Sequence, residues 1–147
     1  MRREAASQVR RDATFEAFAS DLDPEAIRLT RENAAKAGVA GRIHVRQADL
    51  ADFAPAFPED RKGIVITNPP YGERLLGSAE AEAICRTMGQ VFPPRDDLGY
   101  YIISPHEDFE GVFGRPAARR RKLYNGMIKC QVYMYFQNPA KQHEKRP

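Results

Sequence analysis

The sequence has few residues of the kinds that hold metals or build disulfides. Of its 147 residues only two are cysteines and three are histidines. Cys85 and Cys130 lie far apart, without a Cys-x-x-Cys pair or the Cys/His spacing of a metal site. We therefore expect no metal site and no disulfide, but two ordinary thiols in a reducing compartment.

Long apolar stretches are also missing. No run approaches the length of a membrane-spanning helix, and no segment has the pattern of a signal peptide. These absences predict a cytoplasmic protein without a membrane partner.

The composition is that of a folded protein, with 42% hydrophobic and 29% charged residues. We expect one domain over residues 1–138 and a polar tail over 139–147. The net charge is only +3, so the basic residues matter mainly where they cluster. The clusters are Arg2-Arg3, Arg10-Arg11, residues 115–122 and residues 141–146.

Strand and helix patterns alternate along the chain. Asp23 followed by Pro24 predicts a helix start, and Gly38 predicts its left-handed end after Ala37. Asn125-Gly126 between two strand-like runs predicts a hairpin. The other expected elements are the end of a charged helix at 2–12, strands at 14–20, 43–47, 64–67 and 98–104, a linker at 52–61, a helix at 79–92, a short helix from 105–108, and hairpin strands at 121–124 and 127–136.

This order predicts an α/β fold, a doubly wound Rossmann-like sheet that ends in an antiparallel hairpin. The apolar run at 98–104 is long enough to be buried on both faces of the sheet.

The most informative motif is Asn68-Pro69-Pro70-Tyr71, directly after the strand at 64–67. The prolines have no N–H and a fixed φ, so the loop is stiff and its carbonyls stay free to accept hydrogen bonds. The Asn68 amide oxygen and the Pro69 carbonyl can hold an amino group, while the ring of Tyr71 can stack on a base. This chemistry suits methyl transfer to an exocyclic nitrogen. A proline-rich turn without a ligand is the alternative.

Acidic residues follow two further strands. Asp21 could accept both hydroxyls of a ribose, and Asp49 could accept from the amino group of an adenine. Asp23 is expected mainly as a helix cap. Ligands of open α/β sheets bind beyond the carboxyl ends of the strands, so Asp21, Asp49 and Asn68 together predict one binding edge.

Four segments resemble the class I methyltransferase domain of the THUMP-domain-containing 23S rRNA guanine-N2 methyltransferases: residues 20–24, 47–49, 67–75 and 121–126. The resemblance implies S-adenosylmethionine as cofactor, bound by Asp21 and Asp49. It implies the motif from Asn68 to Tyr71 as the catalytic segment. Glu73 and Arg74 would border the substrate, although a surface ion pair explains them equally well.

Basic residues precede the hairpin turn. Arg119, Arg120 and Arg121 could grip phosphates of a ribosomal RNA, with a solvated strand face as the alternative.

The family carries a strand and a glycine-rich loop before the segment that matches residues 2–12, and no glycine precedes Gly38 here. The resemblance thus implies a domain without its first strand and glycine-rich loop. The strands that end at Asp21 and Asn68 would each lose a partner, which favours self-association. The expected reaction is methylation of guanine N2 in 23S rRNA. The alternatives are N6-adenine methylation and a non-catalytic remnant that binds RNA weakly.

Overall fold

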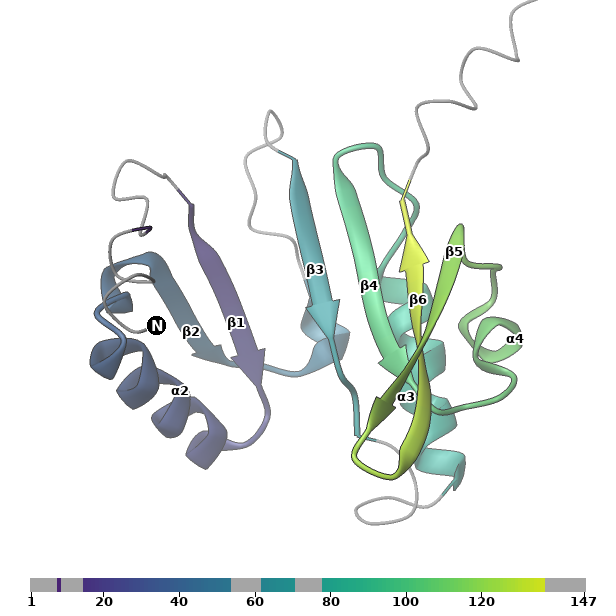
Figure 1. The fold of residues 1–147 in the computed structure, drawn as a ribbon, viewed down its shortest axis with the longest axis horizontal. Coiled ribbons are helices and arrows are strands. Elements are labelled where there is room, and N and C mark those ends of the chain that lie inside the picture. The colour runs from purple at the N-terminus through teal and green to yellow at the C-terminus, as the bar shows by residue number, and fades with distance from the viewer. Residues whose placement is uncertain (1–7, 9–14, 54–61, 71–77, 137–147) are drawn as a thin grey trace, which may run out of the picture. The chain divides into compact units, whose positions relative to one another are not determined.

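The computed structural model describes residues 8, 15–53, 62–70 and 78–136 (Figure 1). The chain divides into two compact units, Met1–Asp49 and Leu50–Pro147. The predicted helix end at 2–12 and the tail at 139–147 lie outside the described residues, as does most of the linker at 52–61. No helix in the described part of the chain has both the length and the apolar character needed to span a bilayer.

The first unit is a parallel β-α-β arrangement. Strand β1 (Ala17–Asp21) pairs with β2 (Ile43–Gln47), and helix α2 (Pro24–Lys36) and the 3-10 turn η1 (Ala40–Arg42) connect them. The Asp23 carboxylate accepts from the Glu25 N–H at 2.9 Å, so the predicted N-cap is confirmed. Gly38 has a φ of 71°, as expected for the residue that ends this helix.

The second unit contains a four-stranded sheet. Its strands are β3 (Gly63–Thr67), β4 (Leu98–Ser104), β5 (Arg119–Asn125) and β6 (Ile128–Tyr135), in the order β3-β4-β6-β5. The β3–β4 pair is parallel, whereas β4–β6 and β6–β5 are antiparallel. A 3-10 turn, η2 (Leu50–Asp52), precedes the sheet, and α3 (Ser78–Val91) and α4 (Phe109–Phe113) are its helices. The predicted α/β fold with a sheet that ends in an antiparallel hairpin is confirmed.

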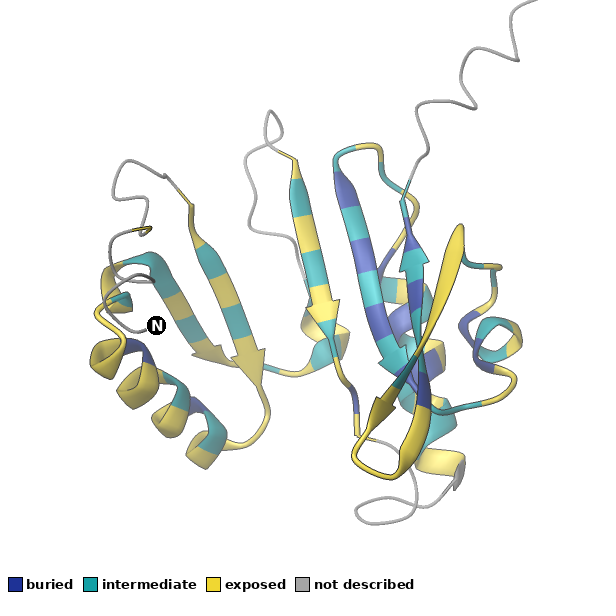
Figure 2. Cartoon of the chain, in the orientation of Figure 1, coloured by how far each residue is buried: buried dark blue, intermediate teal, exposed yellow. Residues whose placement is uncertain are grey.

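Both helices pack on one face of this sheet. The buried cluster joins Met88 of α3 and Phe109 of α4 to Tyr100 of β4 and Tyr133 of β6. Dark blue, buried stretches lie on both β4 and β6 (Figure 2). Gly89 permits the close approach of α3 and α4, because a Cβ there would lie 2.0 Å from the Phe113 carbonyl oxygen.

The other face of the sheet is only partly covered. Alternate residues of β4 are buried on the helix side, and the residues between them are half-buried. The prediction that β4 is buried on both faces is therefore wrong for the second face. On β3 the side chains of Ile64 and Ile66 are 62% and 74% exposed. Among the described strands, β1 pairs only with β2 and β3 pairs only with β4.

The hairpin forms one residue later than the Asn-Gly pair suggests. Asn125 still pairs with Ile128, so the two-residue turn is Gly126–Met127. Gly126 has a φ of 61° and no non-glycine residue has a positive φ in the described part. Glycine at the first turn position is typical of a type II′ turn, whereas type I′ needs positive φ at both positions.

Candidate functional site

Asp21 is the last residue of β1, and its side chain is exposed and oriented. One carboxylate oxygen accepts from the Asp23 N–H at 2.9 Å. The loop that follows is tied to the end of β2, because the Gln47 amide donates to the Leu22 carbonyl at 2.8 Å and the Ala48 N–H donates to the Asp21 carbonyl at 3.0 Å. Within the described residues the second oxygen of Asp21 accepts no hydrogen bond, which leaves an anchored acceptor for a ligand hydroxyl.

Asp49 lies at the same end of the parallel pair. Asp21 is opposite Gln47 in the register, and Asp49 follows two residues later. The structure therefore brings both predicted cofactor ligands to the carboxyl edge of the first unit, where ligands of parallel sheets bind.

Asn68, Pro69 and Pro70 follow β3 in the second unit. Asn68 and Pro70 are exposed and Pro69 is buried, so the backbone is anchored between two exposed residues. Thr67, the last residue of β3, pairs with Ile102 of β4. Tyr71, Glu73 and Arg74 lie outside the described residues.

His106 lies in the loop after β4 and is not one of the predicted site residues. Because β3 and β4 are parallel, their following loops leave the same edge of the sheet. The backbone N–H of His106 donates to the Ser104 hydroxyl at 3.1 Å, and its backbone carbonyl accepts from the Tyr133 hydroxyl at 3.2 Å. The ring Nε2 of His106 is 3.7 Å from a carboxylate oxygen of Glu82. The only feature of the sequence that could have pointed to His106 as a site residue is its place two residues after a strand.

The basic residues of β5 do not share one environment. Arg120 forms an ion pair with Glu110 of α4 at 3.2 Å. Arg119 and Arg121 are exposed and have no ion-pair partner among the described residues. The three arginines predicted to bind RNA together therefore differ, because Arg120 is paired within the protein and Arg119 and Arg121 are not paired within its described part.

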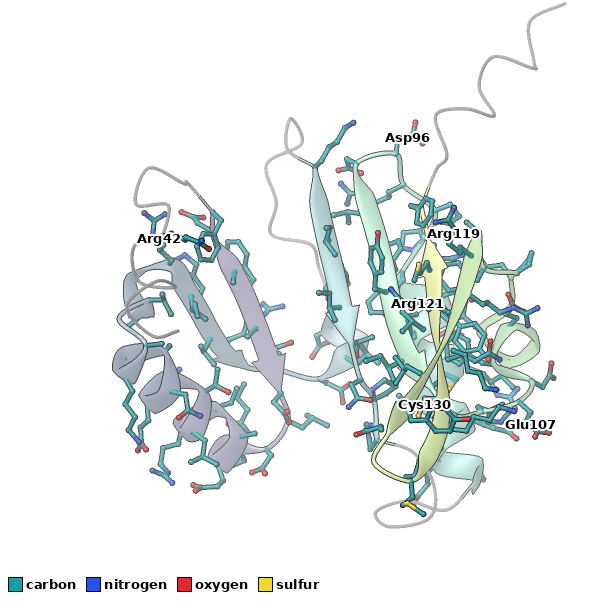
Figure 3. The ribbon with its side chains drawn as sticks, in the orientation of Figure 1. Arg42, Asp96, Glu107, Arg119, Arg121 and Cys130 are labelled. Atoms are coloured by element: carbon teal, nitrogen blue, oxygen red, sulfur yellow. The ribbon has the colours of Figure 1, made fainter. Side chains whose placement is uncertain are left out.

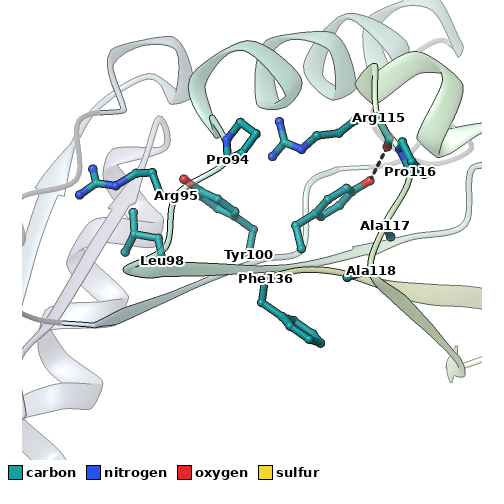
Figure 4. Close-up of a pocket in the computed structure, with 10 residues that line it drawn as sticks. Pro94, Arg95, Leu98, Tyr100, Arg115, Pro116, Ala117, Ala118 and Phe136 are labelled. Atoms are coloured by element: carbon teal, nitrogen blue, oxygen red, sulfur yellow. Dashed lines mark hydrogen bonds between the residues drawn. The ribbon is translucent and has the colours of Figure 1, made fainter. Parts of the chain in front are cut away.

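A pocket of about 330 Å³ opens at the other end of the second sheet, around Leu98 at the start of β4 (Figure 4). Its polar groups already have partners. Tyr100 donates to the Pro93 carbonyl at 2.8 Å, Tyr135 donates to the Arg115 carbonyl at 3.2 Å, and Arg115 donates to the Phe92 carbonyl. Arg95 is bound to Asp97, and this guanidinium lowers the pKa of the Asp97 carboxyl. These contacts join loops, and the predicted site residues lie elsewhere.

The family model described as "RMKL-like, methyltransferase domain" matches residues 1–134. The protein named "Putative RNA methyltransferase YpsC" from Bacillus subtilis (strain 168) is 37% identical over 134 residues, which are 91% of this chain and 34% of YpsC.

A second relative is the "Ribosomal RNA large subunit methyltransferase K/L" of Methylococcus capsulatus, which is 37% identical over 78% of this chain and 15% of its own length. Among solved structures, SMU.472 complexed with SAH has a TM-score of 0.82 and 34% identity, over 93% of this chain and 36% of that one. The chain therefore spans about a third or less of the relatives that it matches.

Proposed function

The chain belongs to the RMKL-like methyltransferase domain family, and from this premise we propose that it is part of an enzyme that transfers a methyl group from S-adenosylmethionine to RNA. The observation that carries the proposal is the Asn68-Pro69-Pro70 segment directly at the carboxyl end of a parallel strand. The crystallised relative with bound SAH supports the cofactor, and the relatives named as RNA methyltransferases support the substrate class.

The first unit suits the nucleoside part of this cofactor. Asp21 is held by the Asp23 N–H and keeps one oxygen for a ribose hydroxyl. Asp49 at the same edge would accept from the adenine amino group. The role proposed for Asp21 has a parallel in dinucleotide-binding sheets, where a carboxylate accepts a hydrogen bond from a ribose hydroxyl.

The second unit suits the amine that receives the methyl group. S-adenosylmethionine supplies a methyl group on a positively charged sulfur. The Asn68 amide oxygen and the Pro69 carbonyl would accept the two N–H groups of an exocyclic amine and so aim its lone pair outward. The amine nitrogen would gain its bond to the methyl carbon as the S–CH3 bond breaks, with S-adenosylhomocysteine as the leaving group, and one amine proton would then leave to water. Alignment of this kind needs no strong base.

We further propose guanine N2 of 23S rRNA as the target, on the resemblance of residues 67–75 and 121–126. Tyr71 would stack on a base flipped out of its helix, and Glu73 and Arg74 would border it. N6 of adenine is the competing target. The proposed compartment is the cytoplasm.

The cofactor is tested first, by calorimetry with S-adenosylhomocysteine. Asp21→Asn should weaken binding about tenfold or more, because a hydrogen bond to a charged acceptor contributes about 1.5–3 kcal/mol. Asp23→Asn is the matched control, since asparagine also caps helices. Equal weakening by both variants would contradict the role of Asp21.

The reaction is tested with labelled S-adenosylmethionine and 23S rRNA. Asn68→Ala should lower methyl transfer by about 100-fold or more, the loss of an interaction made mainly in the transition state, with cofactor affinity unchanged. Mass spectrometry of the digested RNA should give N2-methylguanosine. N6-methyladenosine would contradict the guanine target, and bound cofactor without any methylated product would favour the non-catalytic remnant.

A further inference from the structure

Four consecutive cations, Arg119 to Lys122, lie on β5 at the edge of the second sheet. Successive side chains of a strand point to opposite faces, and residues paired across an antiparallel ladder share a face. Arg120 pairs with Tyr133, which is buried in the core beneath the helices. Arg120 and Lys122 therefore belong to the helix-covered face, and Arg119 and Arg121 to the open face.

Arg120 has a structural partner on its own face. Its guanidinium lies 3.2 Å from one oxygen of Glu110, and the other oxygen of Glu110 accepts from the Ala117 N–H at 2.6 Å. This carboxylate thus links α4, the start of the hairpin and Arg120. The charge of Arg120 is compensated within the protein.

Arg119 and Arg121 are in the opposite situation. Both are exposed, and the described part of the chain gives neither of them an ion pair (Figure 3). Residues two apart on a strand are separated by about 6.8 Å, which is comparable to the spacing of successive phosphates along an extended nucleic-acid strand. Two uncompensated guanidiniums at this spacing suit bidentate binding of adjacent phosphates.

The same face also offers aromatic rings. Arg119 is opposite Met134, and Met134 is opposite Tyr101 of β4. The ring of Tyr101 is stacked with Phe136 at 6.4 Å between centroids, and both side chains are half-buried. Tyr101 is two strand spacings, about 10 Å, from β5. Charge together with rings favours nucleic acid over a simple polyanion.

We propose that a single-stranded segment of RNA lies along the open face of β5, with successive phosphates bound by Arg119 and Arg121 and none by Arg120. The choice of RNA rests on the proposed function. The division of the arginines rests only on the strand register and the Glu110 ion pair. Arg119 and Arg121 would bind the RNA, while Arg120 between them joins β5 to α4 through Glu110.

The test measures the salt dependence of binding to a fluorescein-labelled single-stranded RNA of about 12 nucleotides, within the usual site size, without cofactor. Each phosphate contact on a single strand contributes about 0.7 to the slope of log K against log salt. Arg119→Ala with Arg121→Ala should therefore lower the slope by about 1.4. Arg119→Lys with Arg121→Lys should retain it, because the charges remain.

Arg120→Ala is the matched control, and it should change the slope by less than half as much as the double variant. An equal change in Arg120→Ala, or an unchanged slope in the double variant, would overturn the inference. If the double alanine variant lost as much affinity for heparin as for RNA, the inference would also be overturned, because the site would then bind any polyanion. Since no cofactor is present, these results are independent of the methyl-transfer test.

Discussion

At the residue scale, three buried tyrosines hold the loops of the second unit. The hydroxyls of Tyr100, Tyr133 and Tyr135 donate to the backbone carbonyls of Pro93, His106 and Arg115 at 2.8, 3.2 and 3.2 Å. Burial raises the pKa of each phenol above its ordinary value of 10.0. Each hydroxyl therefore keeps its proton in the folded state at a pH where an unfolded chain would lose it.

This difference predicts an alkaline loss of stability. Above about pH 10 the unfolded chain releases phenolic protons that the folded chain still binds, so stability falls as pH rises. Below that pH these groups give no dependence. The urea concentration at the unfolding midpoint should therefore decrease as the pH rises from about 10 to about 11.

Tyr135→Phe should flatten this fall, at a cost of about 1 kcal/mol at neutral pH for the lost hydrogen bond. Tyr124→Phe is the control, because Tyr124 is 64% exposed. A pH profile that both variants share with the natural chain would show that the buried phenols are not responsible.

The predicted site residues show which parts of a site a sequence can give. Asp21 ends a strand and Asp49 and Asn68 follow strands, and strand ends are visible in a pattern of β-branched and apolar residues. The contact between Glu110 and Arg120 joins a helix to a strand that follows it. No local pattern predicts such a pairing, and His106 was missed because its partners come from three separate elements.

At the element scale, the turn of the hairpin determines what β5 presents. A slip of one residue in register would exchange the faces of Arg119 and Arg120. Asn125-Gly126 predicted the hairpin correctly, but an Asn-Gly pair reads most naturally as a type I′ turn, and the structure places Gly126 first in the turn. The sequence thus predicted the existence of the strands better than the direction of their side chains.

The turn can be tested by replacing its glycine. Gly126→Ala should lower the free energy of unfolding by about 1–2 kcal/mol, because a left-handed φ costs that much for a residue with a Cβ. Met127→Ala should be close to neutral, since Met127 is 99% exposed and has no positive φ. Chemical unfolding of both variants checks this. Equal effects would mean that the turn conformation does not control stability.

Helix α2 shows the opposite outcome, because its limits are encoded locally. Asp23, Pro24 and Gly38 each occupy the predicted end position. Burial of β4 was predicted less well, since an apolar run does not reveal whether a helix covers one face or both.

At the scale of the whole chain, buried apolar residues are distributed unevenly. Among the described residues, the first unit contributes only Ile27 and Ala34 to the buried hydrophobic set, and all other members belong to the second unit. Phe15, Phe18 and Leu22 of the first unit are 52%, 45% and 61% exposed. The hydrophobic stabilisation of the first unit is correspondingly small.

Hydrogen exchange should reveal this difference. Amides of β4 and β6 should exchange at rates close to those set by global unfolding, and amides of β1 and β2 should exchange much faster through local opening. Mass spectrometry of peptides from the two units measures both rates under one condition. Equal protection of β1 and β4 would show that the two units open together.

The place of β3 at the edge of its sheet also has a consequence for the protein at high concentration. Its five residues, Gly-Ile-Val-Ile-Thr, carry no charge, and among the described strands only β4 pairs with it, so one side of β3 offers backbone groups that no described strand binds. Such a segment can stack in register with copies of itself about 4.8 Å apart, as in a cross-β fibril. Lys62 precedes the strand directly and is exposed. Stacking would bring each lysine next to its copies, so we expect the charge of Lys62 to oppose fibril growth.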